Sequence, residues 1–273
     1  MKLPFFLPLM QTNIRMIDYH MHSILSDGKN TYEEMILAGI EKGLEEIGLT
    51  DHVCLRPVPW GTCPADRAVM TAQILELQEK YNHLIRVRYG IEMDYFPGRE
   101  DEIAEMIDSL PVDYVIGSVH FIDEWNFDGD DSLYGKWTND ELYNIYFELV
   151  QMAAKSRLFD VIGHLDVIKK FRVYPESDQS WLLETTLRVI AQNNLVVELN
   201  TGGQDRPCAE FYPSLSILRQ CAQMNIPLTL SSDAHQADQV GRHFEEALAM
   251  LRQTGIRELA TFSRRRRGVF RIR

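Results

Sequence analysis

The sequence lacks the features that would indicate a secreted, membrane-spanning or nucleic-acid-binding protein. It has only four cysteines and no CxxC pair, which favours reduced thiols in a cytoplasmic protein over a disulfide framework. No run approaches the roughly 20 apolar residues that span a bilayer, so no membrane contact of that kind is expected. Positive charge is scarce, since 28 Lys and Arg face 40 Asp and Glu, for a net charge of −12. This balance argues against a broad basic surface for nucleic acid.

Both ends of the chain carry patterns that imitate other signals. Residues 1–10 are apolar like a signal peptide, but the run is short, contains two prolines and is followed by no small-residue cleavage site. We therefore interpret residues 1–15 as an N-terminal extension outside the core. Four arginines occupy positions 264–267. We expect them in a solvated tail or at a surface strand edge, with a weak nucleic-acid or membrane contact as the alternative.

What the sequence does contain is a regular alternation of short apolar runs and longer helical patterns. Strand-like runs occur near residues 16–20, 46–50, 86–92, 113–119, 159–163, 195–199 and 227–231. Helical periodicity covers residues 31–42, 66–84, 100–110, 138–157, 178–193 and 213–225, and Asn30 is the expected N-cap of the first helix. Because no flexible linker interrupts these units, we expect parallel strands with right-handed crossovers in one domain, residues 16–273.

Most of the eight histidines follow directly after the apolar runs. The candidate metal ligands at these positions are His20, His22, Asp27, His52, Glu92, His120, His164, Asp233 and His235. A doubly wound sheet would use only some of these strand ends, whereas a closed barrel gathers the loops after all its strands at one face. The pattern therefore predicts an α/β barrel of seven strands.

The spacing and the residue types at these ends point to a multinuclear metal centre. His20 and His22 lie two residues apart, so their side chains point to the same side of an extended backbone. Glu92 ends an apolar run, and a bridging position between two cations would satisfy both oxygens of a carboxylate that is costly to bury unpaired. Nine ligands exceed the three or four that one zinc ion uses. We therefore predict two or three ions of Zn²⁺, Mn²⁺, Fe²⁺ or Co²⁺.

Several residues near these loops are given lesser roles. Asp94 is expected to support the ligands or the local structure. Cys54 and Cys208 stay open as peripheral metal ligands, because both lie close to the loops of the expected site. His83 and His243 are expected at the surface, with an approach of His243 to a bound phosphate as the alternative.

Seven short motifs that hold these residues occur in a characteristic order. They are His20-Met21-His22 with Ser26-Asp27-Gly28, Thr50-Asp51-His52, Gly90-Ile91-Glu92-Met93-Asp94-Tyr95, Gly117-Ser118-Val119-His120-Phe121, Gly163-His164-Leu165-Asp166, Glu198-Leu199-Asn200-Thr201 and Ser232-Asp233-Ala234-His235. In this order they resemble the PHP (polymerase and histidinol phosphatase) family over about residues 16–250. The resemblance is strongest to its histidinol-phosphate phosphatase branch.

The resemblance implies a distorted seven-stranded TIM-like (β/α)7 barrel with a trinuclear metal centre. By motif, one ion would be held by His20, His22, Glu92 and Asp233, a second by Glu92, His120 and His164, and a third by Asp27, His52 and His235. It also implies a phosphoric monoester hydrolase of histidine biosynthesis, which converts L-histidinol phosphate to L-histidinol and phosphate.

For this reaction we expect a hydroxide that bridges two ions beside Glu92 to attack phosphorus. Arg206 and Arg172 are the expected phosphate clamps. The acid for the leaving group is left open between His52, His235 and a metal-bound water.

Three other functions stay open. Asp27 is similar to the PHP branch that acts on nucleotides and oligonucleotides, so a nucleotide or another small phosphomonoester is the first alternative. A non-catalytic PHP-like module is the second, although such members lose ligands and this chain keeps a full set. A metal-dependent amidohydrolase is the third, but no lysine follows a strand at the position where such barrels carry a bridging lysine. The sequence leaves the oligomeric state open.

Overall fold

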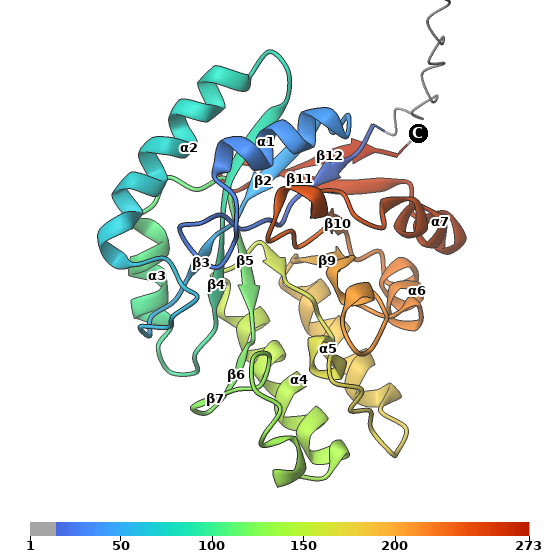
Figure 1. Cartoon of the computed structure of the whole chain (residues 1–273). Coiled ribbons are helices and arrows are strands. Elements are labelled where there is room, and N and C mark those ends of the chain that lie inside the picture. The colour runs from blue at the N-terminus through green and yellow to red at the C-terminus, as the bar shows by residue number, and fades with distance from the viewer. Residues whose placement is uncertain (1–14, 273) are drawn as a thin grey trace, which may run out of the picture.

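The computed structural model describes residues 15–272, which form a barrel of parallel strands surrounded by helices (Figure 1). Neighbouring strands follow the order β1 (Ile17–Asp18), β2 (Glu46–Leu49), β4 (Arg86–Asp94), β5 (Tyr114–Ser118), β8 (Val161–Ile162), β9 (Val196–Asn200) and β10 (Leu228–Ser231), and β3 (His52–Val53) also pairs with β4. The barrel closes between β10 and β1, because the Tyr19 amide donates to the Leu230 carbonyl at 3.0 Å and Met21 pairs with Ala234. The predicted seven-stranded α/β barrel is confirmed.

The helices lie on the outside of the strands in Figure 1. They are α1 (Tyr32–Glu41), α2 (Arg67–Tyr81), α3 (Glu100–Asp108), α4 (Asn139–Ser156), α5 (Ser180–Gln192), α6 (Leu215–Gln223) and α7 (Phe244–Thr254). The predicted cap of α1 was wrong by one residue. Thr31 caps α1 in a capping box with Glu34, while the side-chain oxygen Oδ1 of Asn30 accepts from the Ala237 amide at 2.9 Å.

Two aromatic residues fill the interior toward the N-terminal ends of the strands. The Tyr114 hydroxyl donates to the Tyr19 carbonyl at 2.7 Å, and the two rings lie 4.8 Å apart. Gly48 and Gly90 make room for the Tyr114 ring, since a Cβ at Gly48 would lie 1.7 Å from its hydroxyl and one at Gly90 would lie 2.5 Å from its Cζ. This part of the barrel is therefore a packed core.

A C-terminal hairpin of β11 (Glu258–Ser263) and β12 (Arg266–Arg271) covers the N-terminal end of the barrel. Phe262 of β11 is buried, with its ring 5.5 Å from that of Tyr114. The arginine run forms the turn and the start of β12. Arg265 pairs with Asp160 at 2.5 Å, just before β8, and donates to the Leu158 carbonyl at 2.7 Å. The run thus belongs to a strand edge rather than to a tail.

Some sequence predictions concern the chain outside this barrel. The interpretation of residues 1–15 as an extension falls, except for residue 15, outside the described residues. Over residues 15–272, no helix has both the length and the apolar character required to cross a membrane. A shorter hairpin, β6 (Phe121–Ile122) and β7 (Trp125–Asn126), follows β5 and leads toward the mouth of the barrel.

Candidate metal centre

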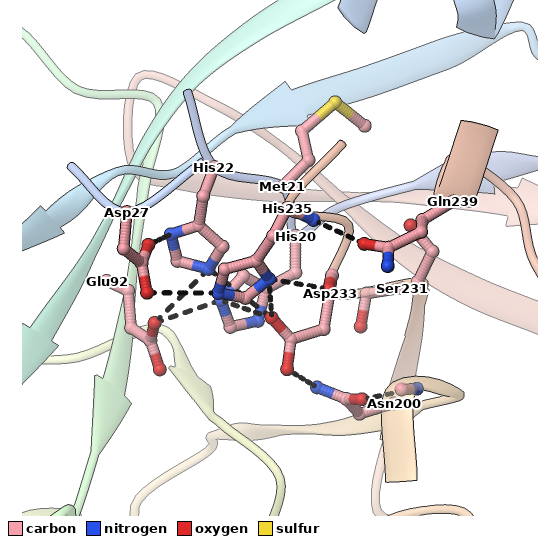
Figure 2. Close-up of polar contacts among 12 residues, drawn as sticks. His20, Met21, His22, Asp27, Glu92, Asn200, Ser231, Asp233, His235 and Gln239 are labelled. Carbon is pink, nitrogen blue, oxygen red and sulfur yellow. Dashed lines mark hydrogen bonds and ion pairs between the residues drawn. The ribbon is translucent and has the colours of Figure 1, made fainter. Parts of the chain in front are cut away.

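The loops that follow the strands bring the nine predicted ligands together at the C-terminal end of the barrel. His20 and His22 follow β1, His52 begins β3, Glu92 lies in β4, His120 follows β5, His164 follows β8, and Asp233 and His235 follow β10, while Asp27 reaches in from the loop before α1. Figure 2 shows His20, His22, Asp27, Glu92, Asp233 and His235 converging on one another. The imidazoles of His20 and His22 have no exposed surface, whereas Asp27 and His235 remain 30% and 24% exposed.

Glu92 occupies the centre of this group and each of its oxygens faces different imidazoles. Its Oε2 lies 3.0 Å from His20 Nε2 and 3.1 Å from His52 Nδ1. Its Oε1 lies 2.9 Å from His164 Nε2 and 3.5 Å from His120 Nε2. This geometry suits a carboxylate that bridges two cations.

The donor atoms fall into overlapping groups that could each hold an ion. Atoms within 4.8 Å of one another come from His22, Asp27, His52 and His235, from His20, His22 and Glu92, and from His52, Glu92 and His120. Asp233 Oδ1 lies 3.4 Å from His22 Nε2 and 3.9 Å from His20 Nε2. The groups resemble the predicted shares, but His22 and His52 each belong to two of them.

The hydrogen bonding of the imidazoles fits metal ions at this site. Both ring nitrogens of His22 are buried without a hydrogen-bond partner, and His52 Nδ1 makes no hydrogen bond although it lies 3.1 Å from Glu92 Oε2. Unpaired buried polar atoms are rare in folded proteins because they carry a desolvation cost. A cation would satisfy them, and the mixture of imidazole and carboxylate donors suits a divalent ion.

Three of the imidazoles are oriented by an oxygen on Nδ1. His20 Nδ1 lies 2.6 Å from Glu198 Oε1, and His120 Nδ1 lies 2.8 Å from Asp94 Oδ1, as expected of a supporting role for Asp94. His235 Nδ1 lies 3.0 Å from the Asp233 carbonyl oxygen. With Nδ1 as the donor in each case, Nε2 presents its lone pair to the centre of the site.

Asp233 is held in an unusual backbone conformation at the mouth of the barrel. Its φ of 52° lies in the left-handed region that non-glycine residues seldom adopt. The Arg242 guanidinium donates to the Asp233 carbonyl at 2.8 Å, and Asn200 Nδ2 donates to Asp233 Oδ2 at 3.1 Å. These contacts aim the other carboxylate oxygen, Oδ1, at the imidazoles, as Figure 2 shows.

The electrostatics of the site favour ionised carboxylates. Burial opposes ionisation of Glu92, but the imidazoles of His52 and His20 hold the pKa of this carboxyl well below its usual range. The pKa values of two of the imidazoles shift in opposite directions. Burial lowers the pKa of His52 to about 3. Burial also acts to lower the pKa of His120, but the carboxylates of Asp94 and Glu92 outweigh it and raise that pKa to about 10.

A cavity of about 260 Å³ opens over these residues. Apart from the predicted ligands, its lining includes Trp60, Asn126, Asp128, Gly129, Val167, Lys170, Gly202, Arg206 and Tyr212. Arg206 therefore lies where a phosphate clamp was predicted. Arg172 does not line this cavity; its Nε donates to the Pro207 carbonyl instead. Lys170, two residues before Arg172, does line the cavity, and its Nζ lies 2.8 Å from Asp128 Oδ1.

Comparison with known proteins agrees with this geometry. The pattern of the PHP domain matches residues 18–202. Over 255 residues the chain is 35% identical to the "Probable histidinol-phosphatase" of Deinococcus radiodurans. The alignment covers 91% of this chain and 97% of that relative. The chain belongs to the PHP domain family.

Solved structures of this family have the same fold. Histidinol phosphate phosphatase from Lactococcus lactis, complexed with zinc, L-histidinol and phosphate, superposes on this PHP chain with a TM-score of 0.80 at 27% identity, covering 93% of this chain and 99% of that one. A second protein, from Listeria monocytogenes, matches with a TM-score of 0.78 at 21% identity over 84% of this chain and 99% of its own, which shows the shared fold. The cluster in this PHP barrel is a site for divalent metal ions.

Sequence reasoning missed several residues of this PHP site. Glu198 was noticed only as part of a motif, and no pattern showed that it contacts His20. Trp60 comes from the loop after β3, where its ring lies 4.6 Å from that of His52. Lys170 lies six residues after the predicted ligand His164, and Arg172 lies eight residues after it. A basic residue shortly after a predicted ligand was therefore a signal that fitted both.

Other predicted residues lie away from the cavity. His83 is exposed, as predicted. His243 is half-buried and lies 2.8 Å from Asp205 Oδ1 rather than in the cavity lining. Cys54 packs with Phe96 and Phe121, and Cys208 contacts the Gly203 carbonyl, so neither thiol joins a group of donors that could hold a metal.

Proposed function

We propose that this PHP-family protein is a histidinol-phosphate phosphatase, which hydrolyses L-histidinol phosphate to L-histidinol and phosphate in histidine biosynthesis. The observation that carries the proposal is the set of nine donor residues, Glu92 and eight others around it, beside a cavity that Lys170 and Arg206 also line. The relatives support the substrate, because proteins named histidinol-phosphatase match over 85% or more of this chain. The Lactococcus lactis structure contains zinc, L-histidinol and phosphate.

Two or three divalent ions would be held by the residues of the cluster, with zinc, manganese and iron as the candidates. His20, His22, Glu92 and Asp233 would hold one, Glu92, His120 and His164 a second, and Asp27, His52 and His235 a third. Such ions supply a nucleophile near neutral pH by lowering the pKa of water, and they polarise phosphoryl oxygens. This role fits the unpaired ring nitrogens of His22.

The side chains at the cavity wall would bind the phosphoryl group. Lys170 is 13% exposed at its side chain and Arg206 lies in the cavity lining, so both present cations toward the site. A fixed positive charge beside the phosphorus stabilises the negative charge on the transferring group. Arg172 keeps a place in this proposal only if its guanidinium turns inward from the Pro207 carbonyl.

His52 and His235 are the candidates for protonating the leaving oxygen. The two roles of His235 compete, because its Nδ1 contacts the Asp233 carbonyl and leaves Nε2 either to bind a cation or to carry the proton. His52 is more buried, with 9% of its side chain exposed against 24% for His235. His235 is thus better placed to reach a leaving group that departs toward the opening of the cavity.

The cavity suits a small phosphomonoester rather than a polymer. Its volume of about 260 Å³ approaches the lower end of the range for small-molecule sites, and the chain carries a net charge of −12. We expect the protein in the cytoplasm, where its four free thiols would remain reduced.

The test measures phosphate release from L-histidinol phosphate, glycerol phosphate and adenosine monophosphate, with Zn²⁺ or Mn²⁺ added. We expect the highest kcat/KM for L-histidinol phosphate. A preference for the nucleotide would replace the substrate with the nucleotide alternative. No release from any ester by protein with confirmed bound metal would overturn the phosphatase proposal and favour the non-catalytic module.

A further inference from the structure

Glu198 is a fully buried carboxylate behind the metal centre and outside the cavity lining. It lies in β9, with no exposed surface. Its Oε1 accepts from His20 Nδ1 at 2.6 Å, and the Ser231 hydroxyl donates to the same oxygen. Its Oε2 accepts from the His164 backbone amide at 2.5 Å. Donors therefore face both oxygens, and the side chain acts as a hydrogen-bond acceptor on each side.

The contact with His20 determines which ring nitrogen faces the site. Because the Ser231 hydroxyl and the His164 amide already donate to this side chain, the 2.6 Å contact places the proton of a neutral His20 ring on Nδ1, as a further donor. Nε2 then carries a lone pair and lies 3.0 Å from Glu92 Oε2. Glu198 thereby selects the tautomer that can bind a cation beside Glu92.

The same carboxylate reaches ligands on two other strands. Its contact with the His164 amide fixes the loop after β8. Glycine is needed at position 163 of this loop, since a Cβ there would lie 2.5 Å from Ser118 Oγ. Asn200 Nδ2 donates to Glu198 Oε2 at 3.2 Å and to Asp233 Oδ2 at 3.1 Å. Figure 2 shows the Asn200 contact with Asp233. One buried group therefore connects three candidate ligands.

We propose that Glu198 is a positioning residue of the metal centre, which sets the tautomer of His20 and the register of His164 and Asp233 around Glu92. The inference rests on the metal centre of the proposed function and is independent of which phosphomonoester is hydrolysed.

The experiment compares Glu198→Gln with the wild-type protein. The amide keeps the shape of the side chain, but its NH₂ group only donates, so the partners of either Oε1 or Oε2 lose their acceptor. We expect zinc affinity, measured by chelator competition, to fall by about 10- to 100-fold. Glu198→Asp, which keeps the charge, should lose less. Glu79→Gln, at an exposed position of α2, is the matched control and should bind zinc like the wild type.

A second readout separates positioning from a purely structural role. Imidazole ¹⁵N spectra of the zinc-loaded wild type should show the His20 proton on Nδ1, and this signal should shift or disappear in Glu198→Gln. Folded Glu198→Gln with unchanged zinc affinity and an unchanged His20 signal would overturn the inference, even if its stability falls. If Glu198→Gln does not fold, a wild-type His20 protonated at Nε2 would overturn it instead. Absence of phosphatase activity in the wild type would bear only on the proposed function.

Discussion

The two ends of the barrel are built from the same strands but have opposite chemistry. At the C-terminal end, imidazoles and carboxylates crowd around Glu92, and the ring nitrogens of His22 are buried without partners. At the N-terminal end, the rings of Tyr19, Tyr114 and Phe262 pack together beneath the β11–β12 hairpin. Glu46, a buried acid at that end, accepts from the Tyr19 hydroxyl, and it accepts from the Arg88 guanidinium at 2.8 Å.

This difference separates the residues that would bind metal from the residues that stabilise the fold. Buried polar groups that are fully paired, like Glu46, add no site for a ligand. Buried groups left unpaired, like His22, reduce stability until a cation binds. Substitutions at the first end should therefore change activity and metal binding, whereas those at the second should change stability.

The largest effect is expected from Glu92→Gln at the C-terminal end. Loss of the central carboxylate should lower kcat by about a thousand-fold, or ~4 kcal/mol, because the nucleophile loses its bridging position. Phosphate release by protein purified alongside Glu79→Gln measures this change. Activity within tenfold of the control would show that Glu92 does not bridge ions.

The opposite end is tested by Phe262→Ala. Removing this buried ring should cost about 3 kcal/mol of unfolding free energy, measured in urea, because its contacts with Tyr19 and Tyr114 are lost. The kcat of the folded variant should stay close to wild type. Val269→Ala is the matched control, since Val269 of the same hairpin is 63% exposed. A variant that keeps its stability but loses activity would contradict the division between the two ends.

Removal of metal should lower the free energy of unfolding, and this loss should arise at the C-terminal end of the barrel alone. At a free zinc concentration of 100 times the Kd, one bound ion stabilises the folded state by about 2.7 kcal/mol, and a chelator should abolish this gain. Because the two ends are separate, Phe262→Ala should show the same zinc-dependent gain as the wild type. A gain that vanishes in Phe262→Ala would show that the ends are coupled.

The smallest effect distinguishes two neighbouring cations at the rim. Lys170→Met should lower kcat/KM by about tenfold, or ~1.4 kcal/mol, because Lys170 lines the cavity. Arg172→Met should change kcat/KM by less than twofold, since its guanidinium contacts Pro207. The reverse ranking would restore Arg172 as the phosphate clamp.

The sequence was sufficient to predict the strands and their ends, because apolar runs and helical periodicity reflect local burial. β2, β4, β5, β9 and β10 lie within two residues of the predicted runs. The pattern was weaker for the β11–β12 hairpin, whose turn contacts Asp160 through the Arg265 side chain and Asp113 through the Arg264 backbone amide. Such pairing depends on residues far apart in the chain.

For the site, the residue types and their strand-end positions were enough to select nine side chains that the fold brings together, with Glu92 at their centre. The same information did not determine where a side chain lies around the rim of the cavity, because a residue in a loop can point inward or outward with the same sequence. Arg172 and Lys170 lie in one short loop, and only the fold determined which of them enters the cavity.

By itself, the sequence determined the barrel and the chemistry of its mouth, since strand periodicity and the order of ligand residues are local properties of the chain. The tertiary structure alone decided that Glu198 of β9 contacts His20 of β1, that Asn200 contacts Asp233, and that Phe262 covers the opposite end. The contact between Glu198 and His20 depends on closure of the barrel between β10 and β1, which brings together two residues that are 178 positions apart in the chain.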